Sequence, residues 1–274
     1  MPVTDGVLVH RYPMHPRLGR HQRLDGRSLW FIHRHKHSHV LKPTHWEPAI
    51  PVLDQEDLEA QGIHTSSLFP GAPEVDALGS CTGNAATAAV SRILNADEAR
   101  AAGLNYLDAI AAEEWAIGQY AAATRVDDCA GQWPTDDTGS SGLANAQVLK
   151  AGGLIGGYRH ALDADGLASL LQTDGVMLGM AWYNAFFEPG GPGAFIDADP
   201  DWARSGIAGG HEIYATGLEQ IVQDHAGRVI PEKTVVTCRN SWSQSWGDAG
   251  SFRVHLSTLY GPLRSSLDAI QIHA

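Results

Sequence analysis

The spacing of hydrophobic positions changes about half-way along the chain. In the first half, an alanine-rich apolar run follows Gly83 and extends to Leu94, and it predicts a buried helix of small residues. Two further helices are expected over residues 105–123 and 143–151. In the second half, short apolar runs replace this spacing. They predict strands at residues 176–182, 212–217, 234–238 and 251–254.

This order of elements, helices first and strands later, predicts an α+β protein with two segregated lobes. We expect a helical lobe at about residues 78–160 and a β-rich lobe at about 170–274, with a ligand site in the cleft between them. Prolines and glycines predict a loop between residues 51 and 77. Residues 1–45 form an N-terminal arm that is rich in histidine.

Four histidines of the arm alternate with other polar residues, which predicts that they share one side of a strand: His33, His35, His37 and His39. One interpretation is a metal site, and the other is a solvated basic arm packed along the body of the protein. Four ligands on one flat strand cannot easily surround a tetrahedral ion, and no carboxylate lies among them in the sequence. We therefore predict a structural arm and no metal.

Composition and charge narrow the possible partners. The net charge of −12 argues against nucleic acid or an anionic membrane as a main partner. No apolar run approaches the roughly 20 residues that span a bilayer. The first residues lack the basic start and apolar stretch of a secretory signal. These patterns predict a cytoplasmic protein, and they do not indicate an oligomeric state.

The three cysteines cannot build a disulfide framework, because they are few, odd in number and far apart. Cys129 and Cys238 are interpreted as small buried hydrophobes. Cys81 differs, because it lies where a loop of small residues leads into the alanine-rich helix. The free amides and the dipole of a helix N-terminus favour a thiolate, so we expect a depressed pKa for Cys81.

A cysteine nucleophile also needs a base and a group that holds the base in place. His211 enters a predicted strand after Gly209 and Gly210, and it lies 130 residues after Cys81 (211 − 81). Asn240 follows another predicted strand, and its side-chain oxygen could accept a hydrogen bond from the imidazole. Two tryptophans could shield that bond from water and strengthen it: Trp242 and Trp246.

Three motifs together resemble the papain family of cysteine peptidases. The run Asn240-Ser241-Trp242, with Trp246-Gly247 and Gly250, resembles the pattern N-S-W-G-x-x-W-G-x-x-G of that family. Gly210-His211 resembles its histidine motif. The run Leu78 to Ala85 resembles the L-G-S-C-T-G-N-A of bacterial and phage members. The order Cys, His, Asn also agrees, and the resemblance spans roughly residues 45–260.

The resemblance implies a papain-like domain over residues 46–274, with a helical lobe that carries the cysteine and a β-barrel-like lobe that carries the histidine and asparagine. It also implies hydrolysis of a peptide or protein substrate through a thioester on Cys81, without a cofactor. Four residues would bind the substrate backbone by strand-like pairing: Gly139, Ser140, Ser141 and Gly210. The first three could equally cap the helix that follows them.

The sequence departs from the family pattern at several positions. Thr82 stands where tryptophan is common, and Ser243 stands where glycine is usual. The oxyanion glutamine is expected six residues before the cysteine, where the chain has Val75. We predict that residues 56–77 are an insertion, so that Gln55 supplies this donor. Gln61 is a second candidate.

Three functions remain open at this point. The presence of all three reacting residues favours an active peptidase with a bell-shaped pH profile. A catalytically silent relative that binds peptides in the same cleft is an alternative. A transferase that delivers the acyl group to an amine instead of water is another.

Overall fold

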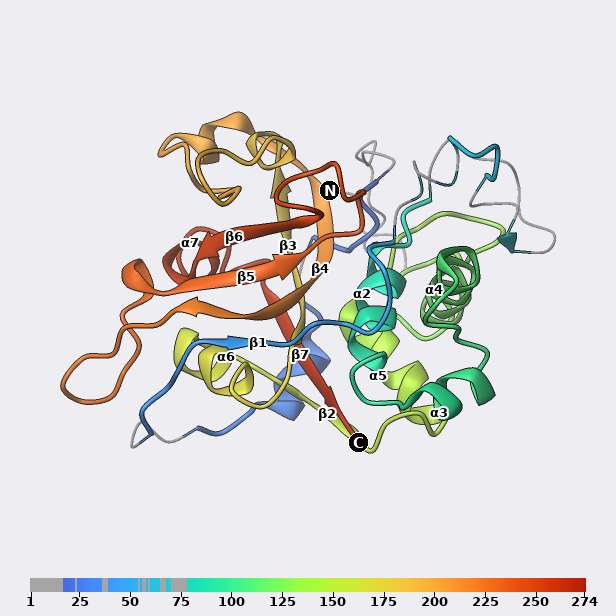
Figure 1. The fold of residues 1–274 in the computed structure, drawn as a ribbon, viewed down its shortest axis with the longest axis horizontal. Coiled ribbons are helices and arrows are strands. Elements are labelled where there is room, and N and C mark those ends of the chain that lie inside the picture. Colours follow the sequence, from blue (N-terminus) through green and yellow to red (C-terminus); the bar gives the residue numbers. More distant parts are fainter. Residues whose placement is uncertain are drawn as a thin grey trace.

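The computed structural model describes residues 17–22, 24–35, 39–53, 55, 58, 60–64, 68–69 and 78–274. In Figure 1, helices α2 to α5 lie on one side of the molecule and the antiparallel strands on the other. The predicted α+β class, with a helical lobe before a β-rich lobe, is confirmed. Among the described residues, no helix is both long and apolar enough to cross a membrane.

Small side chains allow the helices of the first lobe to pack closely. Their bounds are Cys81–Val90 (α2), Ala96–Ala101 (α3), Ala109–Ala123 (α4) and Gly142–Ala151 (α5). Every residue of α2 is buried. A Cβ on Gly83 would lie 2.2 Å from the carbonyl oxygen of Ala116, so α2 approaches α4 closely at this glycine. Helix α4 begins later than predicted, because the carboxylate of Asp108 caps its first turn.

Seven strands form one sheet in the order β2-β7-β3-β4-β5-β6, with β1 beside β4. The four predicted strands correspond to β3 to β6. The bounds are Thr44–His45 (β1), Gly157–His160 (β2), Val176–Tyr183 (β3), Ile207–Gln220 (β4), Val235–Arg239 (β5), Ser251–His255 (β6) and Asp268–His273 (β7). Strand β2 lies in the stretch assigned above to the helical lobe, and it pairs with β7.

Short helical segments connect the strands. Two are α-helices, Ala164–Leu170 (α6) and Leu256–Tyr260 (α7). Three are 3-10 turns, Asn184–Phe187 (η3), Trp202–Ser205 (η4) and Pro231–Lys233 (η5).

Hydrophobic contacts hold the two lobes together. One core group lies within the β-rich lobe, around Trp182 and Phe252. A second group joins buried alanines of α2 to Met177 and Tyr214, which come from β3 and β4. Because side chains from both lobes share this second group, α2 is fixed against the centre of the sheet.

The described part of the arm bonds to both lobes but does not form the predicted histidine strand. Residues Gly26–Phe31 form a 3-10 turn (η1), and only Ile32 bridges to β2. The backbone N–H of His33 donates to the carbonyl of His160 in β2 at 2.7 Å, and its ring lies 3.2 Å from the hydroxyl of Ser169. His33, His35 and His39 lie in irregular backbone, so the strand prediction is wrong for them. His37 lies outside the described residues.

Candidate active site

Cys81 is the first residue of α2, with Ser80 in the capping position. Its sulfur accepts a hydrogen bond from the backbone N–H of Gly19 at 3.3 Å. It also accepts one from the backbone N–H of Glu212. Because Glu212 follows His211 directly, the fold brings the start of α2 and the histidine region of β4 together across the lobe boundary.

Burial raises the pKa of the Cys81 thiol to about 12, although the two backbone hydrogen bonds act in the opposite direction. This result differs from the depressed pKa expected from the helix N-terminus. The physical reason is that Cys81 is only 3% exposed. Part of the arm lies against the sulfur, and the loss of water outweighs the favourable amides.

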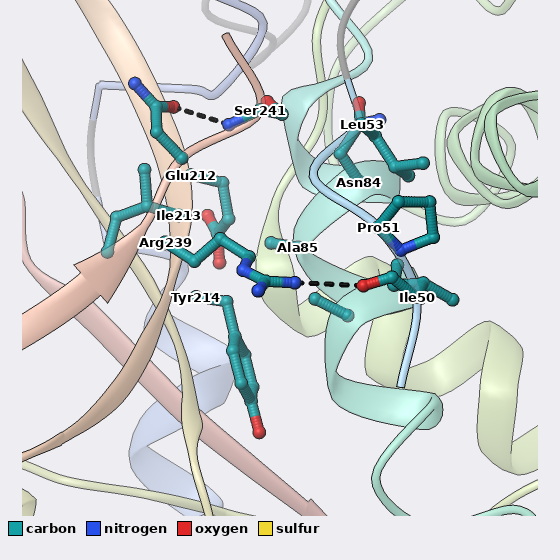
Figure 2. A pocket seen from close by; sticks show the side chains of 12 residues that line it. Ile50, Pro51, Leu53, Asn84, Ala85, Glu212, Ile213, Tyr214, Arg239 and Ser241 are labelled. Atoms are coloured by element: carbon teal, nitrogen blue, oxygen red, sulfur yellow. Dashed lines mark hydrogen bonds between the residues drawn. The ribbon is translucent and has the colours of Figure 1, made fainter. Parts of the chain in front are cut away.

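His211 and Asn240 form a buried pair on the β-rich lobe. His211 Nε2 lies 2.7 Å from Asn240 Oδ1, and the same oxygen accepts from the backbone N–H of Ser241 at 2.8 Å (Figure 2). With Oδ1 as the acceptor, Nε2 carries the hydrogen. Asn240 follows β5 directly, as predicted, and this geometry is the one that the orienting role requires.

Aromatic rings enclose the imidazole of His211. The ring of Trp242 stacks on it with centroids 4.5 Å apart, and Trp246 packs edge-on against Trp242 at 5.4 Å. Trp182 approaches the imidazole edge-on at 4.8 Å. Trp182 was predicted to lie in a strand, but its contact with His211 depends on the pairing of β3 with β4, which no local pattern shows.

Residues 17–22 of the arm run between the two walls of the cleft. On one side, the N–H of Ser140 donates to the carbonyl of Gly19 at 2.7 Å, and the N–H of His21 donates to the carbonyl of Ser140 at 2.9 Å. On the other side, the N–H of Arg20 donates to the carbonyl of Gly210 at 3.0 Å. Two of the four residues predicted to bind a substrate backbone, Ser140 and Gly210, therefore bond to the arm.

Glycines in the cleft walls make room for this segment. A Cβ on Gly139, which has φ of +70°, would lie 2.4 Å from the carbonyl oxygen of Gly19. A Cβ on Gly210 would lie 2.1 Å from the carbonyl oxygen of Arg20. Ser141, in turn, caps α5 by accepting from the N–H of Ala144. The structure therefore assigns the helix-cap alternative to Ser141 alone.

Gln55 lies beside the residues that lead into α2. Its Nε2 donates to the carbonyl of Leu78 and to Ser80 Oγ, both at 2.9 Å, and its Oε1 accepts from the N–H of Leu78. Gln61 is exposed in a turn. Most of the predicted insertion 56–77, including Val75, lies outside the described residues. The oxyanion role of Gln55 stays a prediction.

A small cavity behind the site shows how the stretch that precedes Gln55 is held in place (Figure 2). It is lined by α2, by β4 and β5, and by the stretch from Ile50 to Leu53. The guanidinium of Arg239 donates to the carbonyl of Ile50 at 2.9 Å. A side chain at the end of β5 thus fixes the stretch that carries Gln55 to the helical lobe.

A buried polar network lies beside Cys81, and no motif in the sequence marks it. Ser80 Oγ donates to Asn84 Oδ1, and Asn84 Nδ2 donates to the buried Glu113 at 2.7 Å. A second pair holds the cleft wall. Asp137 accepts from the N–H of Gly79 and from the hydroxyl of Tyr120. Apart from the bond between Ser80 and Asn84, these contacts join residues distant in sequence, so local patterns carry no signal of them.

Within the described part of the chain, two clusters of side chains could hold a metal ion. His21, Asp128 and Cys129 offer ligand atoms that all lie within 4.8 Å of one another, and so do His35, Asp163 and Asp165. His21 Nδ1 lies 3.4 Å from Cys129 Sγ. In the sequence, no carboxylate lies among the four arm histidines. In the fold, carboxylates from α6 and its cap reach His35.

The two lobes meet with a cysteine at the start of α2 on one side and a histidine–asparagine pair on the other. This arrangement is the papain-like fold, the class of structure that the motifs resembled.

Solved structures agree with this class. Xylellain, a cysteine protease from Xylella fastidiosa, is similar with a TM-score of 0.59 and 14% identity, covering 97% of this chain and 99% of that chain. Procathepsin B S9 from Trypanosoma congolense gives a TM-score of 0.51 at 9% identity, covering 94% and 88%. Digestive procathepsin L 3 from the larval midgut of Tenebrio molitor gives 0.50 at 13% identity, covering 94% and 77%. Neither a family model nor a curated protein matches the chain. At these identities the likeness concerns the fold, which is that of papain-like cysteine proteases.

Proposed function

We propose that the chain is a cysteine peptidase that hydrolyses peptide bonds through a thioester on Cys81. The observation that carries this proposal is the hydrogen bond between His211 and Asn240, at 2.7 Å. Glu212, the residue after His211, bonds to the Cys81 sulfur through its backbone N–H. A base that is oriented by a third group and lies near a thiol is the arrangement that nucleophilic catalysis needs.

The first half of the reaction forms the acyl-enzyme. His211 Nδ1 takes the proton of the Cys81 thiol, and the sulfur attacks the carbonyl carbon of the scissile bond. Asn240 keeps the imidazole in the tautomer that this step requires. His211 then returns the proton to the leaving amine as the C–N bond breaks. In the second half, water attacks the thioester with His211 as base, which releases the acid and restores the thiol.

The oxyanion would be stabilised by the backbone N–H of Cys81 and by the side chain of Gln55. Both hydrogens of Gln55 Nε2 are used in the closed cleft, one on Leu78 and one on Ser80. The bond to the Ser80 hydroxyl is the one that would be exchanged for the developing oxyanion, because a serine hydroxyl can rotate to another partner.

The arm would hold this peptidase in a latent form. Residues 17–22 use the backbone groups of Ser140 and Gly210, and they cover the sulfur that a substrate must reach. Activity therefore requires that this segment leave the cleft. A covered cleft is expected both for a latent enzyme and for a silent relative. Only the latent enzyme would hydrolyse peptides after the arm is displaced.

The test is hydrolysis of a mixed peptide library by the full chain, before and after displacement of the arm by a substitution within it. New peptide termini should appear, and Cys81→Ala should abolish them. An added primary amine that becomes joined to the new carboxyl ends would identify the transferase alternative. Absence of any product, with Cys81 accessible to alkylation, would identify the silent relative.

A further inference from the structure

A buried ion pair crosses the cleft between the arm and the β-rich lobe. Arg20 Nε lies 3.2 Å from Glu212 Oε2, and both side chains are 0% exposed. Glu212 follows His211 in β4, so this carboxylate lies next to the reacting region. The mechanism above uses neither side chain, which leaves the presence of an acid at this position to be explained.

Two glycines create the space that the pair fills. A Cβ on Gly179 would lie 2.0 Å from Arg20 Nε and 2.3 Å from Glu212 Oε2, and a Cβ on Gly142 would lie 2.3 Å from Glu212 Oε1. Gly179 belongs to β3 and Gly142 begins α5. The pocket is therefore bounded by both lobes, and any side chain at either glycine would close it.

Arg20 enters this pocket in the way that a residue of a bound peptide would. Its two neighbours pair with Ser140, and its own N–H bonds to Gly210. Gly19, the preceding residue, bonds to the Cys81 sulfur. The side chain in the pocket is thus one residue away from the residue that contacts the nucleophile.

The pocket is matched to a cation rather than to an apolar group. Burial raises the pKa of Glu212 and the Arg20 guanidinium acts against that rise, while the nearby buried Asp268 adds to it. A buried carboxylate without a partner is costly, and a planar guanidinium is the side chain that pairs best with it. When Arg20 leaves with the arm, Glu212 either takes up a proton, because burial already raises its pKa to about 8, or pairs with another cation that enters the pocket.

We propose that Glu212 makes this pocket a subsite for an arginine side chain of the substrate, close to the scissile bond. The inference rests on the proposed peptidase function, which it deepens by naming a substrate class. Arg20 is then an internal competitor that occupies the subsite in the latent form. Glu212 is a specificity-determining residue and takes no part in bond cleavage.

A protection assay tests the subsite without any hydrolysis. The full chain with Gly19→Ala and Arg20→Ala is alkylated at Cys81 in the presence of acetyl-Leu-Gly-Arg-His-amide, which copies residues 18–21, or of the same peptide with citrulline in place of arginine. Citrulline keeps the shape and removes the charge. Arginine should protect at a concentration about thirtyfold lower or more, the usual loss when a buried charge pair loses one partner. In a chain that also carries Glu212→Gln, the arginine and citrulline peptides should protect Cys81 at about the same concentration.

Several outcomes would overturn the proposal: equal protection by the two peptides, an arginine preference that survives Glu212→Gln, or a Cys81 that stays unreactive after both arm substitutions. The comparison of arginine with citrulline requires no change at position 212. It therefore decides the matter even if Glu212→Gln fails to fold.

A parallel hydrolysis assay separates this proposal from the function on which it rests. Peptides with arginine, citrulline or leucine at each position near the scissile bond are compared by kcat/KM. Turnover of leucine peptides without an arginine preference at any position would remove the subsite and leave the peptidase. Arginine-selective protection without turnover of any peptide would leave the subsite and remove the peptidase.

Discussion

Replacing Gly19 by alanine should open the cleft. A Cβ at this position would lie 1.6 Å from the carbonyl oxygen of Gly79 and 2.1 Å from its carbonyl carbon. Backbone atoms of Gly79 cannot yield easily, because its N–H is bonded to Asp137 at 2.9 Å. The arm segment must therefore leave its place beside Cys81, taking with it the hydrogen bond from Gly19 to the sulfur.

The expected acceleration of Cys81 alkylation follows from the fraction of the thiol that is ionised. With a pKa of about 12, roughly 10⁻⁴ of the Cys81 thiol is ionised at pH 8. An exposed thiol of ordinary pKa, about 8.5, is about one quarter ionised at that pH. The more basic thiolate is intrinsically more reactive, which recovers about thirtyfold of the difference. Alkylation of Cys81 should therefore accelerate by about fiftyfold or more, and the removal of steric cover adds to this.

The assay is the rate of iodoacetamide labelling at Cys81, followed by intact mass with peptide mapping. The matched control is Gly26→Ala in the same arm, where a Cβ would meet nothing within 4 Å. The control should be labelled at the wild-type rate. If Gly19→Ala is labelled as slowly as the control, the arm is not what shields the sulfur. If both variants accelerate equally, general loosening explains the result.

Four further predictions concern residues of the site and their dependence on pH. Asn240→Ala should lower kcat by about ten- to a hundredfold and leave a measurable rate, since its role is orientation; complete loss equal to that of Cys81→Ala would contradict this. Gln55→Ala should slow turnover by about a hundredfold or more, whereas Gln61→Ala should have little effect, and the reverse ranking would transfer the oxyanion role to Gln61. The labelling rate of the wild-type chain should rise with pH toward pH 12, and that of Gly19→Ala should level off at lower pH. Because the folded chain keeps the Cys81 proton where the unfolded chain loses it, the free energy of unfolding should fall as pH rises from about 9 toward 12, and less steeply for Cys81→Ala.

Local patterns predicted much of the fold. The apolar runs marked β3, β4 and β5, which lie inside the sheet, and the alternation of buried and half-buried residues marked β6 at its edge. Strands β1, β2 and β7 were not predicted. Their pairing is set by partners far away in sequence, as for β2, which pairs with residues more than a hundred positions later.

The candidate site was predictable only where a motif marked it. The stretches around Cys81, His211 and Asn240 carry recognisable neighbours, and their roles stay predictions. The occupation of the cleft by Leu18, Gly19 and Arg20 depends on pairing with residues 140 and 210. Nothing local distinguishes these three residues from the rest of a polar arm. The raised pKa of Cys81 depends on the same long-range contact, so the helix N-terminus alone suggested the opposite direction.

The proposed role of Cys81 as the nucleophile of a papain-like peptidase can be tested with an inhibitor that reacts with the thiol. The Gly19→Ala chain is titrated with an epoxide inhibitor of papain-like enzymes while both intact mass and peptide hydrolysis are followed. We predict that one inhibitor molecule is added, that it maps to Cys81, and that hydrolysis falls in proportion to the labelled fraction. Hydrolysis that persists when Cys81 is fully labelled would contradict the account.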